Sequence, residues 1–206
     1  MTMRWVVPRV LLGTLAGLVV AGCTSGGDQP QAAATTTAAP TSAADSSSAP
    51  TPTPTPDLPI GCDEILPFTD LDQALGRPLF GETRYVVGVA QPSIGRTGRI
   101  TCQWGLAKGG RGPVPVEVGA STYTDAKAAT DRVAATVADL RSGATSQSEA
   151  TVAGRATTVI GNRTGFTAVV AQGNRTVAVT VLRSTRGQPD RAVVSIATKV
   201  LANWGQ

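Results

Sequence analysis

Residues 114–140 read VPVEVGASTYTDAKAATDRVAATVADL, and this stretch decides the fold because its hydrophobic period changes in the middle. Val114, Val116 and Val118 alternate with other residues, which is the pattern of a half-buried β-strand. A Thr-Asp pair then opens a segment whose apolar residues recur at helical spacing. The expected apolar face of this helix consists of Ala126, Ala129, Val133, Val137 and Leu140. The chain therefore combines strands and helices.

The flanking segments continue this alternation. In chain order we expect a short helix from Thr69 to Gly76, strands over 85–90, 100–106 and 114–120, the helix just described, strands over 152–160, 166–171 and 175–183, and a final helix from Pro189. Pro115 places the third strand at a sheet edge. The order predicts an α+β fold, an antiparallel sheet with helices packed on one face. It is compatible with two αβββ halves plus a C-terminal helix.

Two segments with other compositions precede this domain, which we expect over residues 58–206. Residues 1–22 carry two arginines, no acid and a short apolar run over 10–20, the layout of a secretory signal peptide. Eleven apolar residues are too few to cross a bilayer core of about 30 Å. Residues 23–57 consist mainly of Thr, Ser, Ala and Pro and predict a disordered stalk.

The end of the signal peptide points to lipid attachment. Residues 18–23 read LVVAGC, which resembles the bacterial lipobox. The resemblance implies transfer of diacylglycerol to the Cys23 sulfur and cleavage before that residue. The alternative is an ordinary signal peptide followed by a chance cysteine. We therefore expect a lipid anchor at Cys23 that holds the protein on the extracytoplasmic face of the cell membrane.

Two cysteines remain besides Cys23, namely Cys62 and Cys102, so they can pair with each other. The chain that contains them is predicted to be exported. An oxidising compartment favours their pairing as a disulfide. Free thiols or a metal site are the alternatives, but two cysteines without any histidine make a poor zinc site. We expect no metal and no cofactor.

Composition excludes several kinds of chemistry. The 206-residue chain has no histidine, so it cannot hold a Ser-His-Asp triad or a Cys-His dyad. Tyr123 and Lys127 match the Tyr-x-x-x-Lys pair of short-chain dehydrogenases, but no glycine-rich dinucleotide turn precedes them. Trp104 and Trp204 each fall on the apolar face of a predicted strand or helix. We therefore expect both side chains to lie in the core and not in a pocket. We expect no catalytic residue.

The charge of the predicted domain is basic but dispersed. From residue 58 onward the chain has 16 Lys or Arg and 11 Asp or Glu, a net charge of +5. Its arginines are spread singly along the sequence, which is typical of a solvated surface and not of nucleic-acid binding.

Two short motifs add a family resemblance. Residues 61–66, GCDEIL, and residues 102–104, CQW, resemble the opening cysteine segment and the Cys-x-Trp strand of an actinobacterial, mycobacterial-type secreted lipoprotein family of unknown function. This sequence departs from that family at Gly61, where a proline is usual. The resemblance implies an envelope location and paired cysteines, and it supplies no reaction.

These observations predict a non-catalytic binding or interaction module of the cell envelope. Its partner would be an envelope protein, a cell-wall polymer or a small apolar ligand. The alternative is a carrier of a lipid or other apolar molecule, which requires an apolar cavity of about 300 Å³ or more. An enzyme is the least supported class. A binding module instead predicts an exposed patch that is apolar or rich in arginine.

Overall fold

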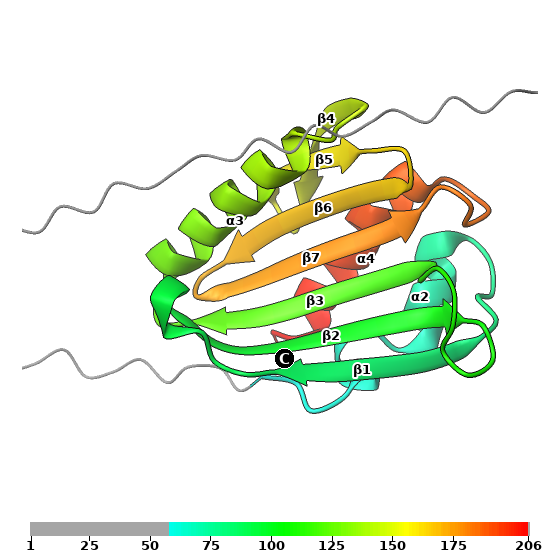
Figure 1. The fold of residues 1–206 in the computed structure, drawn as a ribbon, viewed down its shortest axis with the longest axis horizontal. Helices are drawn as coiled ribbons and strands as arrows, with labels where there is room; N and C mark the ends of the chain where they lie inside the picture. Colours follow the sequence, from blue (N-terminus) through cyan, green and yellow to red (C-terminus); the bar gives the residue numbers. More distant parts are fainter. Residues whose placement is uncertain (1–57, 206) are drawn as a thin grey trace, which may run out of the picture. The chain divides into compact units, whose positions relative to one another are not determined.

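Seven antiparallel strands form one sheet in the residues that the computed structural model describes, 58–205, in the order β1-β2-β3-β7-β6-β5-β4 (Figure 1). The strands are β1 (Glu82–Gly88), β2 (Arg96–Leu106), β3 (Val116–Tyr123), β4 (Ser146–Val152), β5 (Arg155–Gly161), β6 (Gly165–Gln172) and β7 (Arg175–Leu182). The helices are α1 (Cys62–Ile65), α2 (Phe68–Leu75), α3 (Ala126–Arg141) and α4 (Pro189–Asn203), with a 3-10 turn η1 (Pro92–Ile94). The predicted α+β class and antiparallel sheet are confirmed.

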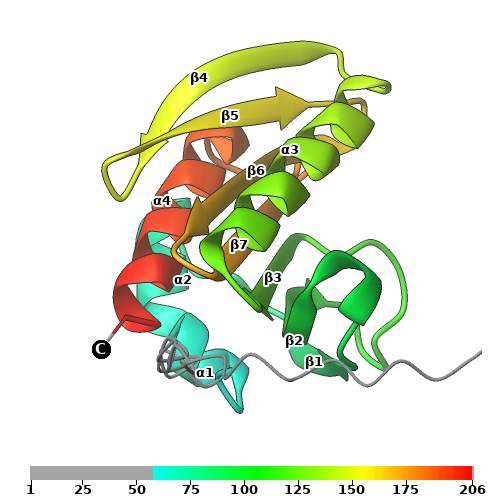
Figure 2. The same cartoon turned by 90° about the vertical axis from the view of Figure 1, so that its left-hand side faces the viewer.

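Helices cover both faces of the sheet, whereas the sequence analysis placed them on one face (Figure 2). On one face, α1, α2 and α4 pack over a core that includes Trp104, Val118 and Val179. On the other face, α3 lies over β6 and β7. The adjacent residues Val169 and Val170 in β6 are both buried, and successive strand residues point to opposite sides of a sheet. A run of consecutive apolar residues is therefore the sequence signal for the second helical layer.

The second half of the chain has four strands and not three. β4 was not predicted, because its sequence SQSEATV is polar at nearly every position and most of it is exposed. A tight turn at Ala153 and Gly154, both with positive φ, joins β4 to β5, so the strand expected over 152–160 begins after this turn. The two halves are therefore not equivalent αβββ units.

β3 is an inner strand, which corrects the edge position inferred from Pro115. The proline lies one residue before β3, so its missing N–H removes no hydrogen bond from the ladder. Its carbonyl still accepts a bond of 2.9 Å from the backbone N–H of Leu182. β3 pairs with β2 on one side and with β7 on the other.

Helices α2 and α4 lie close to their predicted positions. α2 begins at Phe68 and not at the predicted cap Thr69, because the carbonyl of Pro67 accepts the first helical bonds. It ends as predicted at Gly76, whose left-handed φ of 70° suits glycine. α4 begins at Pro189, as predicted. Apolar residues at helical spacing along it are buried, namely Val193, Ile196, Ala197, Val200 and Leu201, together with Trp204 just after its end.

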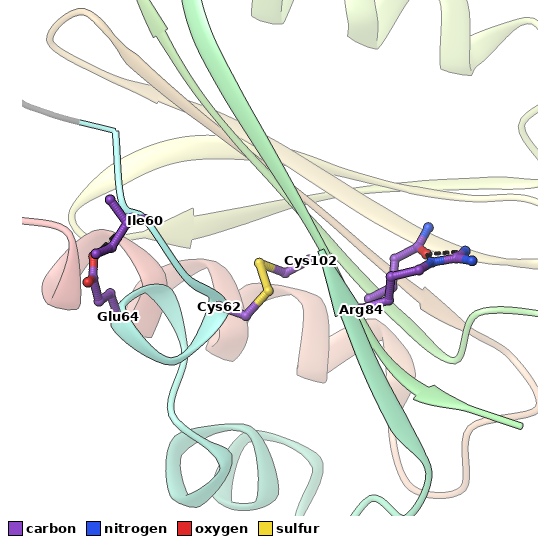
Figure 3. Close-up of a disulfide and its surroundings, with 6 residues drawn as sticks. Ile60, Cys62, Glu64, Arg84 and Cys102 are labelled. Carbon is purple, nitrogen blue, oxygen red and sulfur yellow. Dashed lines mark hydrogen bonds between the residues drawn. A yellow bond between two sulfur atoms is a disulfide. The ribbon is translucent and has the colours of Figure 1, made fainter. Parts of the chain in front are cut away.

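A disulfide between Cys62 and Cys102 joins α1 to β2 (Figure 3). These are the two cysteines that the sequence predicts to pair. Both are buried in the core beneath α4. The single-turn helix α1 was not predicted, and it places Cys62 against the middle of β2.

Three sequence predictions lie outside the described residues: the signal peptide over 1–22, lipidation at Cys23 and the stalk over 23–57. Within residues 58–205, no helix has the length and hydrophobicity needed to span a bilayer.

Candidate anion-binding site

Two arginines of β2 face the same side of the sheet because the strand carries a bulge. Arg96 lies opposite Tyr123, whereas Gly98 lies opposite Thr122, so two steps along β2 match one step along β3. Residues three apart in a regular strand point to opposite faces, and one extra residue restores a common face. Arg96 and Arg99 therefore both line the hollow beneath α3.

A glycine in β3 makes room for the second arginine. A Cβ on Gly119 would lie 3.1 Å from Nη2 of Arg99, closer than side chains normally pack. The Nε of Arg99 donates to Oγ1 of Thr101 at 3.1 Å, which fixes the direction of the side chain. The guanidinium group of Arg99 consequently lies across the backbone of β3, where a larger residue would displace it.

Helix α3 supplies a third arginine, Arg132, from above the sheet. The start of α3 is fixed at two points. Asp125 caps it by accepting from the backbone N–H of Ala128 at 2.8 Å, and this bond lowers the pKa of Asp125. The backbone N–H of Thr124 donates to the carbonyl of Gly95 at 2.8 Å, just before β2 begins. The helix that carries Arg132 is thus tied to the strand that carries the other two arginines.

The three arginines line a partly open cavity of about 210 Å³ between α3 and the sheet. Hydroxyl groups of four residues contribute further polar lining, namely Ser121, Tyr123, Thr136 and Thr176. The remaining lining residues are small or apolar: Gly119, Val133, Val169 and Ala178. The guanidinium groups only donate hydrogen bonds, and hydroxyl groups can also donate. The hydroxyl of Thr136 is the exception, because it donates to the carbonyl of Arg132 at 2.8 Å.

Within residues 58–205, no carboxylate forms an ion pair with these cations. The lining residues include no Asp or Glu. Across residues 58–205 the ion pairs are Lys127 with Asp131 and Lys199 with Asp70, so the three arginines have none. The Nε of Arg96 is buried and has no hydrogen-bond partner among the described atoms.

Nearby acids are engaged elsewhere. Glu117 of β3 accepts a hydrogen bond of 2.8 Å from Gln103, and Asp131 of α3 pairs with Lys127. Arg96, Arg99 and Arg132 are each half-buried. A cation partly withdrawn from water is stabilised when an opposite charge approaches it. The arrangement therefore suits an anion, which would accept charge-assisted hydrogen bonds from the arginines.

The lining of this cavity includes no His, Asp, Glu or Lys that could act as a general base for the hydroxyl groups. The two residues of the Tyr-x-x-x-Lys match, which the sequence analysis did not assign as a catalytic pair, do not meet there. Tyr123 is buried and lines the cavity, whereas the side chain of Lys127 is 83% exposed and pairs with Asp131.

Other residues that the sequence analysis singled out serve the fold. Trp104 and Trp204 are buried in the core. Neither lines the cavity beneath α3 or the two surface grooves, one between η1 and α3 and one between β4 and α4. The carboxylate of Asp70 accepts from Lys199 at 2.8 Å and from Asn203 at 3.0 Å, which joins α2 to α4. The bond from Lys199 is the main cause of the lowered pKa of Asp70. Within the described part of the chain, no three His, Cys, Asp or Glu side chains lie together as metal ligands.

The three arginines of the cavity were not predicted, because dispersed arginines are typical of a solvated surface. One signal was present in the sequence: Gly119 lies inside the predicted strand over 114–120, between the apolar residues Val118 and Ala120. A glycine inside a strand often marks a close approach of another group.

The comparisons with known proteins give a weak structural likeness and no sequence match. No family model matches the chain, and no curated protein matches it. Among solved structures, it is similar to the crystal structure of the extracellular domain of PknH from Mycobacterium tuberculosis, with 13% sequence identity and a TM-score of 0.45. The match covers 69% of this chain and 93% of that chain. The lipoprotein family named from short motifs remains a resemblance, and the chain is assigned to no family.

Proposed function

We propose that this protein is a lipid-anchored, extracytoplasmic binding module without catalytic activity, and that its ligand is a small anion. The observation that carries the proposal is the convergence of Arg96, Arg99 and Arg132 on one cavity with no carboxylate partner. Three like charges repel one another, so their shared placement is unfavourable until an anion enters between them. An anion bound there would accept hydrogen bonds both from β2 of the sheet and from helix α3.

The size of the cavity restricts the ligand class. A volume of about 210 Å³ is below the roughly 300–1,000 Å³ of pockets for drug-sized ligands. It is several times the volume of about 30 Å³ that a water molecule occupies in the liquid. A phosphate, sulfate or carboxylate group with a few waters therefore fits.

The carrier alternative receives less support. Two larger hollows, of about 380 and 360 Å³, are open grooves on the surface. Asp131 lines the first of them, and Glu149 and Asp190 line the second. Neither is the apolar cavity that a lipid tail would require.

The predicted export and anchor support the proposed location. The lipobox-like motif ends at Cys23, and the Thr/Pro-rich segment up to residue 57 follows it. The buried disulfide between Cys62 and Cys102 is of the kind that persists outside the cytoplasm.

Titration of the mature chain with inorganic phosphate tests the ligand class. Cys23→Ala would keep the chain in solution, and ¹⁵N spectra would be recorded at constant ionic strength. We expect saturable shifts at the amides of Gly119, Ser121 and Thr176, because these residues line the cavity. Chloride at equal ionic strength is the control. Absence of saturable shifts with phosphate, sulfate and acetate up to tens of millimolar would contradict the proposal.

A second experiment tests the anchor. In the Cys23→Ala variant of the full chain, we expect the protein to move from the membrane fraction to the soluble fraction, because no thiol remains for diacylglycerol. Thr36→Ala, in the predicted stalk, is the matched control and should stay with the membrane. Unchanged membrane retention of the Cys23→Ala variant would show that the anchor assignment is wrong.

A further inference from the structure

The exposed hydrophobic side chains of the described chain gather at one edge of the sheet. Most of the large ones lie in residues 80–89, and they are Phe80, Tyr85, Val86, Val87 and Val89. Phe80 is 85% exposed, and Val86 and Val87 are 56% and 61% exposed. β1 is an outer strand of the sheet and pairs only with β2 (Figure 1). Its free edge therefore combines unpaired backbone groups with apolar side chains.

β1 has the sequence of an inner strand. Tyr85 and Val87 lie opposite Cys102 and Ile100, on the face that packs against α1 and α4. Val86 lies opposite Thr101 and points to the other face. Apolar residues on both sides of a strand are typical of strands that have neighbours and cover on both sides.

The opposite edge of the sheet, formed by β4, is protected against pairing with another chain. β4 reads SQSEATV, with Glu149 in its middle and polar residues on both faces. Natural sheets protect edges with charges, prolines and bulges. β1 contains no Lys or Pro, and its two charged residues, Glu82 and Arg84, lie in its first half. Its pairing with β2 has an irregularity between these two residues and is regular from Arg84 to Gly88.

We propose that β1 pairs in antiparallel fashion with β1 of a second copy of this chain, about a two-fold axis centred on Val86. This inference is independent of the anion site and goes beyond the proposed function. In this register Val86 lies opposite Val86, and Tyr85 lies opposite Val87. Closed two-fold pairing of one surface with itself is the commonest form of oligomer.

The charges of β1 agree with pairing between copies. In the same register Arg84 lies opposite Gly88, so no like charges face each other. The guanidinium group of Arg84 is already bonded to Oε1 of Gln103, at 3.1 Å from Nε and 2.7 Å from Nη2 (Figure 3). This bond directs its charge toward β2 and away from the free edge. The charges of the strand therefore do not oppose its pairing with a second copy.

Cysteine crosslinking of the mature Cys23→Ala chain tests both the partner and the register. Residues directly opposite in antiparallel strands have Cα atoms about 4.5–5.5 Å apart, within disulfide range. Val86→Cys should therefore give a covalent dimer under mild oxidation. Tyr85→Cys should not, since two Tyr85 positions would be diagonal neighbours beyond about 7 Å. Ser148→Cys on β4 is the matched control, an exposed position on the protected edge.

Sedimentation equilibrium provides the second readout. We expect a reversible dimer that Val86→Lys abolishes and Ser148→Lys does not, because a lysine on a free edge blocks strand addition. A wild-type monomer at all concentrations would overturn the proposal. So would equal crosslinking of Val86→Cys and Ser148→Cys, or a Val86→Cys adduct with a protein of another mass. The Cys62–Cys102 bond is buried and protected from exchange with the added thiol.

Discussion

In the Arg96→Gln/Arg99→Gln double variant we expect the affinity for phosphate to fall by at least about 100-fold. A hydrogen bond to a charged group contributes about 1.5–3 kcal/mol, and this variant replaces two of the three cationic donors. The measurement is the same ¹⁵N titration, or calorimetry with phosphate. The free energy of unfolding without ligand should stay within about 0.5 kcal/mol of the wild type or increase. The reason is that the variant removes mutual repulsion and the unpartnered Nε of Arg96.

The matched control is Arg155→Gln/Arg163→Gln. Both of these arginines are exposed and lie outside the cavity, so this variant makes the same change in net charge. We expect it to bind phosphate as the wild type does. Equal loss of affinity in the two double variants would mean that phosphate responds to overall charge and not to the cavity.

Removal of the disulfide should have the largest effect on stability. The bond closes a loop with a sequence separation of 40, and in the chain-entropy model this stabilises by about 3–4 kcal/mol. Urea unfolding of Cys62→Ala/Cys102→Ala should show this loss. The melting temperature should fall by roughly 10 °C for a domain of this size.

A comparison separates the bond from the packing of its sulfur atoms. Reduced wild-type protein loses the bond but keeps both cysteine side chains. Its loss in free energy of unfolding should therefore be most of the loss seen in the alanine variant. The alanine variant should lose slightly more, because Cys102 is fully buried and its replacement leaves a small cavity. Equal stability of the oxidised and reduced wild type would contradict the expectation.

Much of the fold could be predicted from local patterns. α3 follows from the change of period after β3, and the hairpin of β6 and β7 follows from the turn residues Gly173 and Asn174. β4 could not be predicted, since polar residues on both faces leave no alternation. The second helical layer could have been inferred from Val169 and Val170, two adjacent residues that both require cover.

The site could not be assembled in the same way. The predicted strand over 100–106 includes neither Arg96 nor Arg99, whereas β2 begins at Arg96. In a regular strand these two residues would point to opposite faces, and only the bulge between them brings both to one face. Arg132 joins them because α3 crosses the second face of the sheet, and the sequence analysis left that face uncovered. A binding site made from three elements depends on tertiary geometry that local patterns do not contain.

The Cys62–Cys102 bond also determines how the domain would respond to mechanical tension. Cys62 lies near the start of the described chain, and Cys102 lies in the middle of β2. A pull on the chain before residue 62 passes through the sulfur atoms into β2, which is hydrogen-bonded on both sides. α1, α2 and β1 lie within the covalently closed loop and are shielded from stretching. The edge strand β1 would thus stay unloaded while the ladders on the two sides of β2 bear the force.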